Sequence, residues 1–385
     1  MKVDYLIVGS GLTGAVIARL LVDDGREVVI VERRPHLGGN VYDHAHPSGI
    51  RVHTYGPHYF RTTSEKIWAF VQRFATFYPY EAALKSYVDG QYESWPITAA
   101  YIRRTLGAPW QPEFRGIPAN FQEASLAMMP RLVYEKFVKG YTEKQWGVPA
   151  QTLAATLAAR FDVHEDDEPR LKRHKYQGIP LQGYAHFMRA LLTGIPLLLN
   201  FDYLQDRHAF EAQKLLIFTG PIDEFFGYEF GHLRYRGQQR EHTYLPNVAY
   251  AQPCGQVNNP DSRHGPHIRT LEWKHMMPKE YADKIQGTVL TTETPFTPTH
   301  AHDFEYPFPD EGNAQLYARY RCKAEALPRL LICGRLGEYR YYDMDQAIAR
   351  ATVLAQKILE ENSYPLIQGE KNVPIPIRSH GLVRA

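Results

Sequence analysis

The chain has 385 residues, 44% of them hydrophobic, so it can bury more than one core and two or three domains are expected. Its 44 basic and 42 acidic residues leave a formal net charge of +2, which argues against wrapping nucleic acid or lying on an acidic membrane. Three widely spaced cysteines without a CxxC pair argue against a disulfide framework and a zinc site. No apolar run is long enough to span a bilayer, so we expect a cytoplasmic protein.

The hydrophobic pattern predicts an α/β fold with a Rossmann-like domain, a helical-bundle insert and an antiparallel β-sheet domain. The expected elements are, in chain order, a strand at 5–8, a helix at 12–21, a strand at 28–31, helices between 64 and 159, a helix at 187–194, a strand at 215–220, antiparallel strands within 228–321, a strand at 330–335 and a helix at 344–359. The last strand and helix are expected to complete the first domain.

These elements divide the chain into three predicted domains and a tail. The first domain takes residues 1–77, 205–227 and 328–362, and the helical insert, with a mobile substrate loop, takes 78–180. The sheet domain takes 181–204 and 228–327, and residues 363–385 form a proline-containing tail.

A glycine motif marks the first strand–helix junction. Gly9, Gly11 and Gly14 form GxGxxG between the strand and the helix, and Glu32 ends the next strand. The glycines allow a pyrophosphate to approach the positive end of the helix, and Glu32 can accept hydrogen bonds from a ribose. The motif therefore predicts a dinucleotide, but it does not distinguish FAD from NAD, because both contain the same ADP half. Two histidine-containing runs, at 43–46 and 299–303, lack the HExxH context, so no metal is predicted.

Further motifs carry a resemblance to a known family. Gly38, Gly39 and Asn40 in "ERRPHLGGN" resemble the flavoprotein form of the glycine fingerprint. Together with "HTYGPHYF", "KGYTEKQWG", "YQGIP", "TGPID" and "GRLGEYRYYDMDQ", they make residues 1–360 similar to the bacterial UDP-galactopyranose mutases. The resemblance implies that the first domain binds FAD.

The resemblance assigns the last helix to the cofactor. Asp343 and Gln346 have the spacing of a capping box, and the helix start is expected beside the flavin, where its dipole stabilises negative charge on the reduced ring. The implied cofactor residues are Gly9, Gly11, Gly14, Glu32, Gly38, Gly39, Asn40, Arg335, Tyr342, Asp343, Met344 and Gln346.

The resemblance also implies a UDP-sugar site. Tyr141 would stack on uracil beside Phe137, and Arg160 and Arg269 would hold the diphosphate through forked hydrogen bonds. The implied substrate residues are Phe137, Tyr141, Thr142, Trp146, Arg160, Asn259, Arg269, Tyr306 and Tyr341, with His58 beside the flavin and sugar. Without the resemblance, the spacing of these aromatic residues favours a role in a packed core over a role in binding. For His58, a core position and a binding position are equally compatible with the sequence.

The implied reaction is a redox-neutral interconversion of pyranose and furanose forms. In the family, N5 of reduced flavin attacks the anomeric carbon, UDP departs, and the ring reopens and recloses before UDP returns. Arg160, Arg269 and His58 are then the catalytic candidates, NAD(P)H the external reductant, and a homodimer the expected assembly. The product would be a galactofuranose donor for cell-surface polysaccharide.

Three residues depart from the family pattern: Leu171 stands where the family has a loop Tyr, Glu81 where it has an Asn near the sugar, and Arg61 is the third. Arg61 stands where the family commonly has His, beside the sugar, and its guanidinium could donate a hydrogen bond to an acetamido carbonyl, which makes UDP-N-acetylgalactosamine a candidate substrate. Two other classes remain open: an FAD-dependent oxidoreductase of the amine-oxidase type, and a non-enzymatic nucleotide-sugar binding module.

Overall fold

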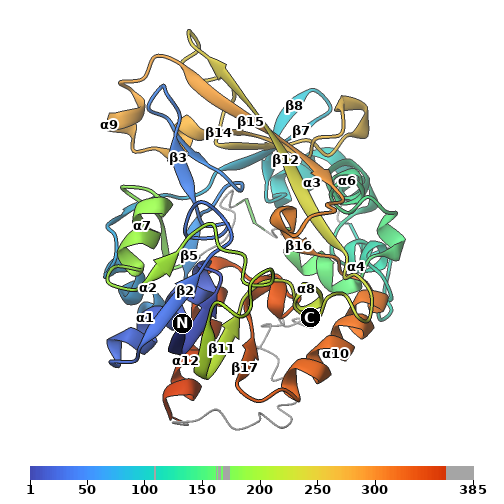
Figure 1. The fold of residues 1–385 in the computed structure, drawn as a ribbon. Helices are drawn as coiled ribbons and strands as arrows, with labels where there is room; N and C mark the ends of the chain where they lie inside the picture. Colours follow the sequence, from blue (N-terminus) through green and yellow to red (C-terminus); the bar gives the residue numbers. More distant parts are fainter. Residues whose placement is uncertain (108–109, 162, 164–165, 168–173, 361–385) are drawn as a thin grey trace.

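A parallel sheet forms the centre of the first domain. The computed structural model describes residues 1–360 except 108–109, 162, 164–165 and 168–173 (Figure 1). The five strands lie in the order β10-β2-β1-β11-β17, and all four pairings are parallel. Their bounds are β1 (Lys2–Val8), β2 (Val28–Val31), β10 (Leu197–Leu198), β11 (Glu211–Phe218) and β17 (Leu330–Ile332).

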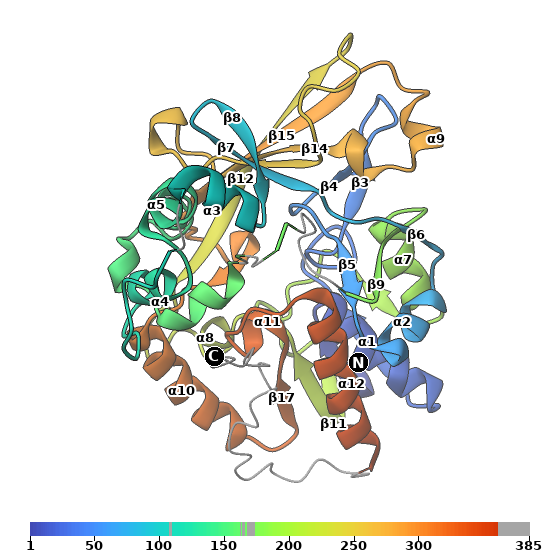
Figure 2. The same cartoon turned by 180° about the vertical axis from the view of Figure 1, so that it is seen from behind.

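The alternation of side chains along β1 gives the sheet two apolar faces. Tyr5 and Ile7 pack with α1 (Leu12–Asp23), α7 (Tyr184–Leu191) and α12 (Met344–Glu360), which cover the face seen in Figure 2. Leu6 belongs to a separate cluster on the other face, and Val3, which lies beyond a shift of the strand register between Val3 and Tyr5, belongs to that cluster too. The predicted βαβ start is confirmed. The final strand pairs with β11, and α12 packs with α1 in the same core.

The structure places α7 and β10 in a different domain from the one that the sequence predicted for them. Residues 181–204 were assigned to the antiparallel domain, but α7 packs on α1 and β10 pairs with β2 in the parallel sheet. The reason is that "PLLL" (196–199) is short and flanked by loops, so that its parallel partner cannot be recognised without the sheet.

A seven-stranded sheet forms the second layer, in the order β16-β12-β15-β14-β13-β7-β8. Only β13 and β7 pair in parallel; the other pairings are antiparallel. The bounds are β7 (Leu84–Val88), β8 (Gln91–Trp95), β12 (Tyr235–Leu245), β13 (Gln256–Asn258), β14 (Arg269–Glu272), β15 (Thr288–Phe296) and β16 (Tyr306–Pro307). Strands β7 and β8 lie within the segment predicted as a helical insert. They form a hairpin that completes this sheet, although the rest of the segment is mainly helical.

Helices and short sheets surround the two main sheets. Within the expected antiparallel region, α10 (Glu311–Glu325) is a fifteen-residue helix, capped at its start by Asp310. The small sheets are β3 (Asp43–Ala45) with β4 (Arg51–His53), and β5 (Phe60–Thr62) with β9 (Tyr176–Pro180) and β6 (Phe77–Pro79). The other elements here are α2 (Glu65–Gln72), α8 (Ile222–Phe225), η4 (Ser262–His264), η5 (Trp273–Met276), α9 (Lys279–Ala282), η6 (Ala301–Asp303) and α11 (Gly334–Gly337).

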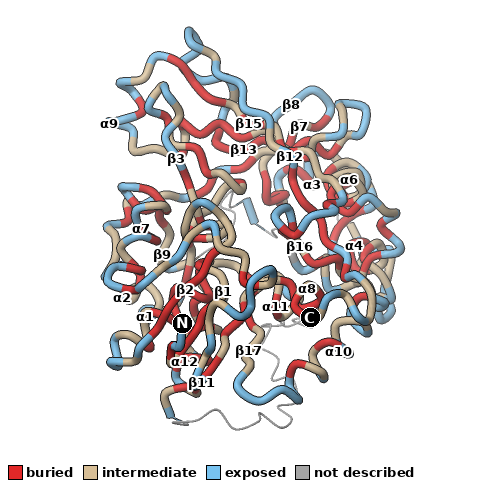
Figure 3. The backbone as a smooth tube through the Cα atoms, viewed as in Figure 1, coloured by how far each residue is buried: buried red, intermediate tan, exposed pale blue. Residues whose placement is uncertain are grey.

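The helical insert packs on one end of the seven-stranded sheet. Its core joins residues of β7 and β8 to those of the insert helices, and the buried segments meet where the two units touch (Figure 3). The helices are α3 (Ala99–Leu106), α4 (Phe121–Met128), α5 (Arg131–Val133), the π-helix η1 (Tyr134–Lys139), α6 (Gly140–Trp146), η2 (Ala150–Thr152) and η3 (Ala155–Arg160). None of the helices in the described residues has the length and apolarity to cross a membrane.

Candidate active site

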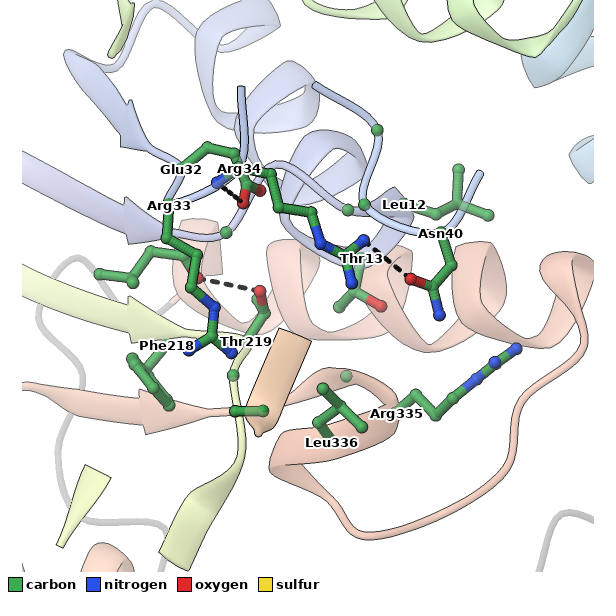
Figure 4. A pocket seen from close by; sticks show the side chains of 18 of the residues that line it. Leu12, Thr13, Glu32, Arg33, Arg34, Asn40, Phe218, Thr219, Arg335 and Leu336 are labelled. Carbon is green, nitrogen blue, oxygen red and sulfur yellow. Dashed lines mark hydrogen bonds between the residues drawn. The ribbon is translucent and has the colours of Figure 1, made fainter. Parts of the chain in front are cut away.

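A cavity lined by glycines lies at the carboxyl ends of β1, β2 and β11. We call it the glycine cavity; its lining includes Gly9, Gly11, Glu32, Gly38, Gly39, Asn40, Thr219, Arg335, Tyr342 and Met344 (Figure 4). This edge of a parallel sheet is where dinucleotides bind. The fold therefore brings residues from four separate segments of the chain together at this edge of the sheet.

The glycines of this cavity are required by close approach. Gly9 has φ +103°, and a Cβ on it would lie 2.2 Å from Thr219 Oγ1. A Cβ on Gly14 would lie 2.2 Å from the carbonyl oxygen of Gly9, and one on Gly39 would lie 2.9 Å from Cα of Gly11. Gly14 does not line the cavity; it allows α1 to begin directly against the strand. The cradle has the narrow backbone walls that a pyrophosphate needs.

Polar side chains close the glycine cavity. Glu32 is buried and accepts hydrogen bonds from the backbone N–H and hydroxyl of Ser10, both at 2.9 Å, and from the backbone N–H of Arg34 at 2.9 Å. A carboxylate has about four acceptor positions, so Glu32 retains capacity for a ribose hydroxyl. The guanidinium of Arg34 donates to Asn40 Oδ1 at 2.8 Å, as the dashed line in Figure 4 marks.

The start of α12 forms the far wall. The side-chain oxygen of Gln346 accepts a hydrogen bond from the backbone N–H of Asp343 at 3.1 Å, which is one half of the predicted capping box. Arg335 donates to the carbonyl oxygen of Tyr342 at 3.0 Å and lies over the ring of Tyr341, 4.7 Å from its centroid. Tyr342 and Met344 line the glycine cavity, whereas Asp343 and Tyr341 line its neighbour.

The neighbour, which we call the arginine cavity, contains three guanidinium groups. Arg61, Arg269 and Arg335 line it together with Tyr306, Tyr341, Asp343 and Asp345. It shares Asn40, His58, Arg335 and Met344 with the glycine cavity. Arg61 comes from β5, and its Nη1 is buried without a hydrogen-bond partner among the described residues.

His58 lies at the junction of these two cavities. Burial, reinforced by His53 nearby, lowers the pKa of His58 to about 3, so the ring is neutral. Its Nδ1 lies 2.7 Å from the carbonyl oxygen of Gly56, which can only accept, so Nδ1 carries the proton and Nε2 is an acceptor. His58 is thus both a buried histidine and a lining residue.

A row of charged and polar side chains crosses the seven-stranded sheet beneath the arginine cavity. Directly paired positions place Asn258 opposite Arg269, Arg269 opposite Glu293, and Glu293 opposite Arg240. Directly opposed residues share one face of a sheet. Arg269 Nε and Arg240 Nε both donate to Glu293, the second at 2.8 Å, and Arg240 binds Glu305 through both terminal nitrogens at 2.7 and 2.9 Å.

The carboxylate at the centre of this row is ionised. Burial alone would raise the pKa of Glu293, but the guanidinium groups of Arg269 and Arg240 hold that pKa below its ordinary value. Two arginines and two glutamates balance within the row, and Arg61 and Arg335 face the same cavity together with Asp343 and Asp345.

A third cavity, which we call the aromatic cavity, lies between the helical insert and the seven-stranded sheet. Its lining includes Trp95, Phe137, Tyr141, Thr142, Gln145, Trp146, Gln256, Asn258, Arg269 and Tyr306. It shares Arg269 and Tyr306 with the arginine cavity. Phe137 is also packed against Trp95 and Tyr101, so the expectation of a core aromatic holds alongside the lining role. The three cavities therefore form a continuous series.

Comparison with known proteins assigns this architecture. A family model described as UDP-galactopyranose mutase matches residues 136–341, and one described as NAD(P)-binding Rossmann-like domain matches residues 7–74. A probable UDP-galactopyranose mutase of Klebsiella pneumoniae is 33% identical over 97% of the chain and 99% of its own length. The chain belongs to the UDP-galactopyranose mutase family. It is therefore an enzyme of an isomerase family that implies FAD, and the glycine cradle fits that cofactor.

A further relative and two solved structures are similar to this chain, and the two structures show a shared fold. A dTDP-fucopyranose mutase of Escherichia coli is also 33% identical, over 93% of the chain and 98% of its own length. Among solved structures, reduced UDP-galactopyranose mutase matches with a TM-score of 0.74 at 15% identity, covering 94% of both chains. A putrescine oxidase matches with a TM-score of 0.59 at 10% identity, covering 94% of the chain and 99% of its own length, which shows a shared fold.

The mutase-family chain does not bring all the predicted residues to a cavity. Asn259 donates to the carbonyl oxygens of His264 and His267, each at 3.2 Å, and its neighbour Asn258 lines the aromatic cavity instead. Arg160 ends η3, and its side chain lies outside the described part of the chain, as do Leu171 and residues 363–385.

Several lining residues were not predicted. Those of the glycine cavity include Thr13, Arg33, Arg34, Thr219 and Glu224, and those of the other two include Tyr55, Tyr59, Gln145, Gln256, Asn258 and Asp345. Thr219 sits in the quoted "TGPID" motif, which was a usable signal. Asn258 had no local signal, because only strand pairing places it beside Arg269.

Proposed function

We propose that the protein interconverts UDP-galactopyranose, or UDP-N-acetylgalactosamine in its pyranose form, with the corresponding furanose. The observation that supports this most is the series of three cavities that share lining residues, with Arg269 common to the second and third. In this arrangement FAD takes the glycine cavity, the sugar and diphosphate take the arginine cavity, and the uridine takes the aromatic cavity. The sugar then meets the flavin beside His58.

When bound and reduced, FAD would supply N5 as the nucleophile that bonds to the anomeric carbon of the sugar. The chain would hold the leaving diphosphate with Arg269 and Arg160, and Tyr306 and Tyr341 would donate hydroxyl hydrogen bonds to it. The neutral ring of His58 presents Nε2 as an acceptor for a sugar hydroxyl. The N-terminus of α12 would favour the reduced, negatively charged flavin.

The uridine would lie among the aromatic residues. Tyr141 provides a stacking face, Phe137 and Trp146 complete the slot, and the two phosphates extend toward Arg269. NAD(P)H is proposed as the external reductant and a homodimer as the assembly. The domain division proposed from the sequence is kept, except that α7 and β10 belong with the FAD domain and the β7–β8 hairpin with the antiparallel sheet.

The acetamido sugar is supported by Arg61. Its buried Nη1 has no partner in the described residues, and it lines the arginine cavity, so it offers a donor to a carbonyl on the sugar. Competition between UDP-N-acetylgalactosamine and UDP-galactose tests this. A strong preference for plain galactose would remove the acetamido substrate and leave the mutase activity standing.

The decisive experiment is turnover with reduced protein. Dithionite-reduced, flavin-loaded protein is mixed with each UDP-sugar, and the pyranose and furanose forms are separated by chromatography. We expect furanose only when the flavin is reduced, with no acceptor consumed per turnover. Stoichiometric consumption of oxygen or a dye with an amine substrate would instead indicate an oxidase, and binding without turnover would indicate a binding module.

A further inference from the structure

A buried, forked ion pair joins β12 to the segment just before β16. Arg240 donates from its two terminal nitrogens to the two carboxylate oxygens of Glu305, at 2.7 and 2.9 Å, and its Nε donates to Glu293 at 2.8 Å. The side chains of Arg240 and Glu305 are only 9% and 7% exposed. The attraction within such a buried pair does little more than offset the loss of hydration of its two charges, so stability alone does not account for it.

We propose that Arg240 and Glu305 are positioning residues for the junction of the glycine and arginine cavities. Their ion pair holds two walls of that junction, the 56–58 loop and Arg335, in a fixed relation to each other. The inference rests on the proposed function, because it takes this junction as the place where flavin and sugar meet. It extends that function to two residues that act through others, beyond those assigned to the cofactor, the nucleotide or the diphosphate.

The first wall is the loop that carries His58. Gly56 has φ +88°, and a Cβ on it would lie 2.8 Å from Glu293 Oε1 and 3.1 Å from Arg240 Nη2. The backbone of the loop therefore rests directly on these two side chains. The carbonyl oxygen of Gly56 in turn accepts the hydrogen bond from His58 Nδ1 at 2.7 Å. The position of the His58 ring thus depends on where the guanidinium of Arg240 is held.

The second wall is reached through the main chain of Glu305. Its backbone carbonyl oxygen accepts a hydrogen bond from Arg335 Nη1 at 3.3 Å, and Arg335 Nη2 donates to the carbonyl oxygen of Tyr342 at 3.0 Å. Arg335 lines both the glycine and the arginine cavities. Glu305 therefore binds Arg240 by its side chain and Arg335 by its main chain, so a displacement of Glu305 moves the second wall as well.

The nucleotide is held independently of this pair. Arg269 donates through Nε to Glu293, and neither Arg240 nor Glu305 is among the described residues that line the aromatic cavity. Removing the pair should therefore leave the binding of UDP nearly unchanged. The flavin and the sugar should lose their alignment, because both walls of the junction shift, and a misplacement of about 1 Å lowers a reaction rate by up to about 100-fold.

The test separates binding from turnover. Arg240→Met, Glu305→Gln and the double variant are prepared with bound flavin and reduced with dithionite. Turnover is measured with whichever of UDP-galactose and UDP-N-acetylgalactosamine the unaltered protein prefers, and rates are divided by the amount of bound flavin. Binding of UDP is measured by isothermal titration calorimetry. We expect kcat to fall about 10- to 100-fold in both single variants, while the Kd for UDP changes less than about threefold.

The double variant distinguishes positioning from stability. Arg240→Met leaves the buried carboxylate of Glu305 without its partner, so this variant loses stability. Adding Glu305→Gln removes that charge, and the double variant should unfold at a higher urea concentration than Arg240→Met. Its kcat should nevertheless stay low, because no ion pair then joins the two walls of the junction. Recovery of kcat together with stability would assign the pair a purely structural role and overturn the inference.

Arg19→Met is the matched control. Arg19 lies on α1, its side chain is 14% exposed, and its Nε donates to Asp23 at 2.8 Å. It is not among the described residues that line the three cavities. This variant also loses an ion pair, and it should keep the kcat of the unaltered protein.

The remaining outcomes are distinct. A kcat equal to that of the unaltered protein in both single variants would overturn the inference and leave the mutase reaction in place. A rise in the Kd for UDP as large as the fall in kcat would also overturn it, because the pair would then serve nucleotide binding. Absence of turnover by the unaltered, reduced and flavin-loaded protein would instead contradict the proposed function.

Discussion

The glycine cavity and the aromatic cavity are built by different means. The first is shaped mainly by backbone: three glycines at one strand–helix junction and two more after β2 bring main chain close to main chain. The second is shaped by side chains from the helical insert and several strands of the antiparallel sheet. A backbone-built cavity depends on the absence of side chains, whereas a side-chain-built cavity depends on the register that brings distant residues together.

The largest expected effect concerns the backbone-built cavity. In Gly14→Ala, the new Cβ would lie 2.2 Å from the carbonyl oxygen of Gly9, so the junction must open and flavin binding should be lost. The absorbance of bound flavin after reconstitution measures this. Gly25→Ala is the control, because Gly25 has φ +79° but no atom within 4 Å of a Cβ; it should cost about 1–2 kcal/mol of stability and keep the flavin.

The next effect concerns the charged row beneath the side-chain-built cavities. Glu293→Gln removes the carboxylate that binds both Arg269 and Arg240 and should lower the free energy of unfolding by about 3 kcal/mol, because the buried Arg269 loses this ion pair and Arg240 keeps only its pair with Glu305. Urea denaturation measures the change. Glu325→Gln breaks only an exposed pair with Arg321 and should change stability by less than about 1 kcal/mol. Equal stability of the two variants would show that the row is not needed for the fold.

A sharper test of the same region keeps the charge. Arg269→Lys retains a positive group but loses the fork that binds Glu293 and is proposed to bind the diphosphate at the same time, so kcat/KM should fall about 100-fold, or about 2.7 kcal/mol. Steady-state kinetics with the reduced enzyme measures this, and Arg263→Lys, at an exposed position nearby, is the control. Activity within threefold of the unaltered enzyme would argue against forked binding at Arg269.

The most gradual expected effect, small over any one pH unit, is a pH dependence of stability. Burial lowers the pKa of His53 and of His58 to about 3, while in the unfolded chain both have the ordinary value of 6.5. The unfolded state therefore binds more protons below pH 6.5, so stability falls as pH falls from 6.5 toward 3. The expected slope is up to about 1.4 kcal/mol per pH unit for each histidine.

One variant isolates the contribution of His58. His58→Gln should reduce the slope of unfolding free energy against pH between 6 and 5 by up to about 1.4 kcal/mol per pH unit, measured by urea denaturation at each pH. An unchanged slope would mean that other groups carry the acid sensitivity.

The two regions also differ in how far the sequence predicted them. The glycine motif, Glu32 and the final helix are local features of the chain, and the structure has them at one sheet edge, as expected. The hydrophobic periodicity does not indicate that Tyr141 and Arg269 lie in one cavity. The resemblance to the family predicted that both residues belong to one binding site. Neither residue is marked by its neighbours in sequence.

What the sequence could not supply depends on pairing between strands. Asn258 and Asn259 are identical in type, and only the register of β13 against β14 decides that the first lines the cavity and the second does not. Likewise, the β7–β8 hairpin was hidden in a segment rich in helical patterns, because its partner β13 lies far along the chain. Register and distant pairing are properties of the folded sheet.

The alternation of side chains in that sheet limits how the substrate side of the protein can vary in evolution. Asn258, Arg269, Glu293 and Arg240 come from four strands, and inserting or deleting one residue in any of them would turn its member of the row to the opposite surface. We therefore expect insertions and deletions to be tolerated in the connecting loops and to abolish activity when they fall within these strands. Descendants with new sugar preferences should differ by replacement at fixed positions, with strand lengths preserved.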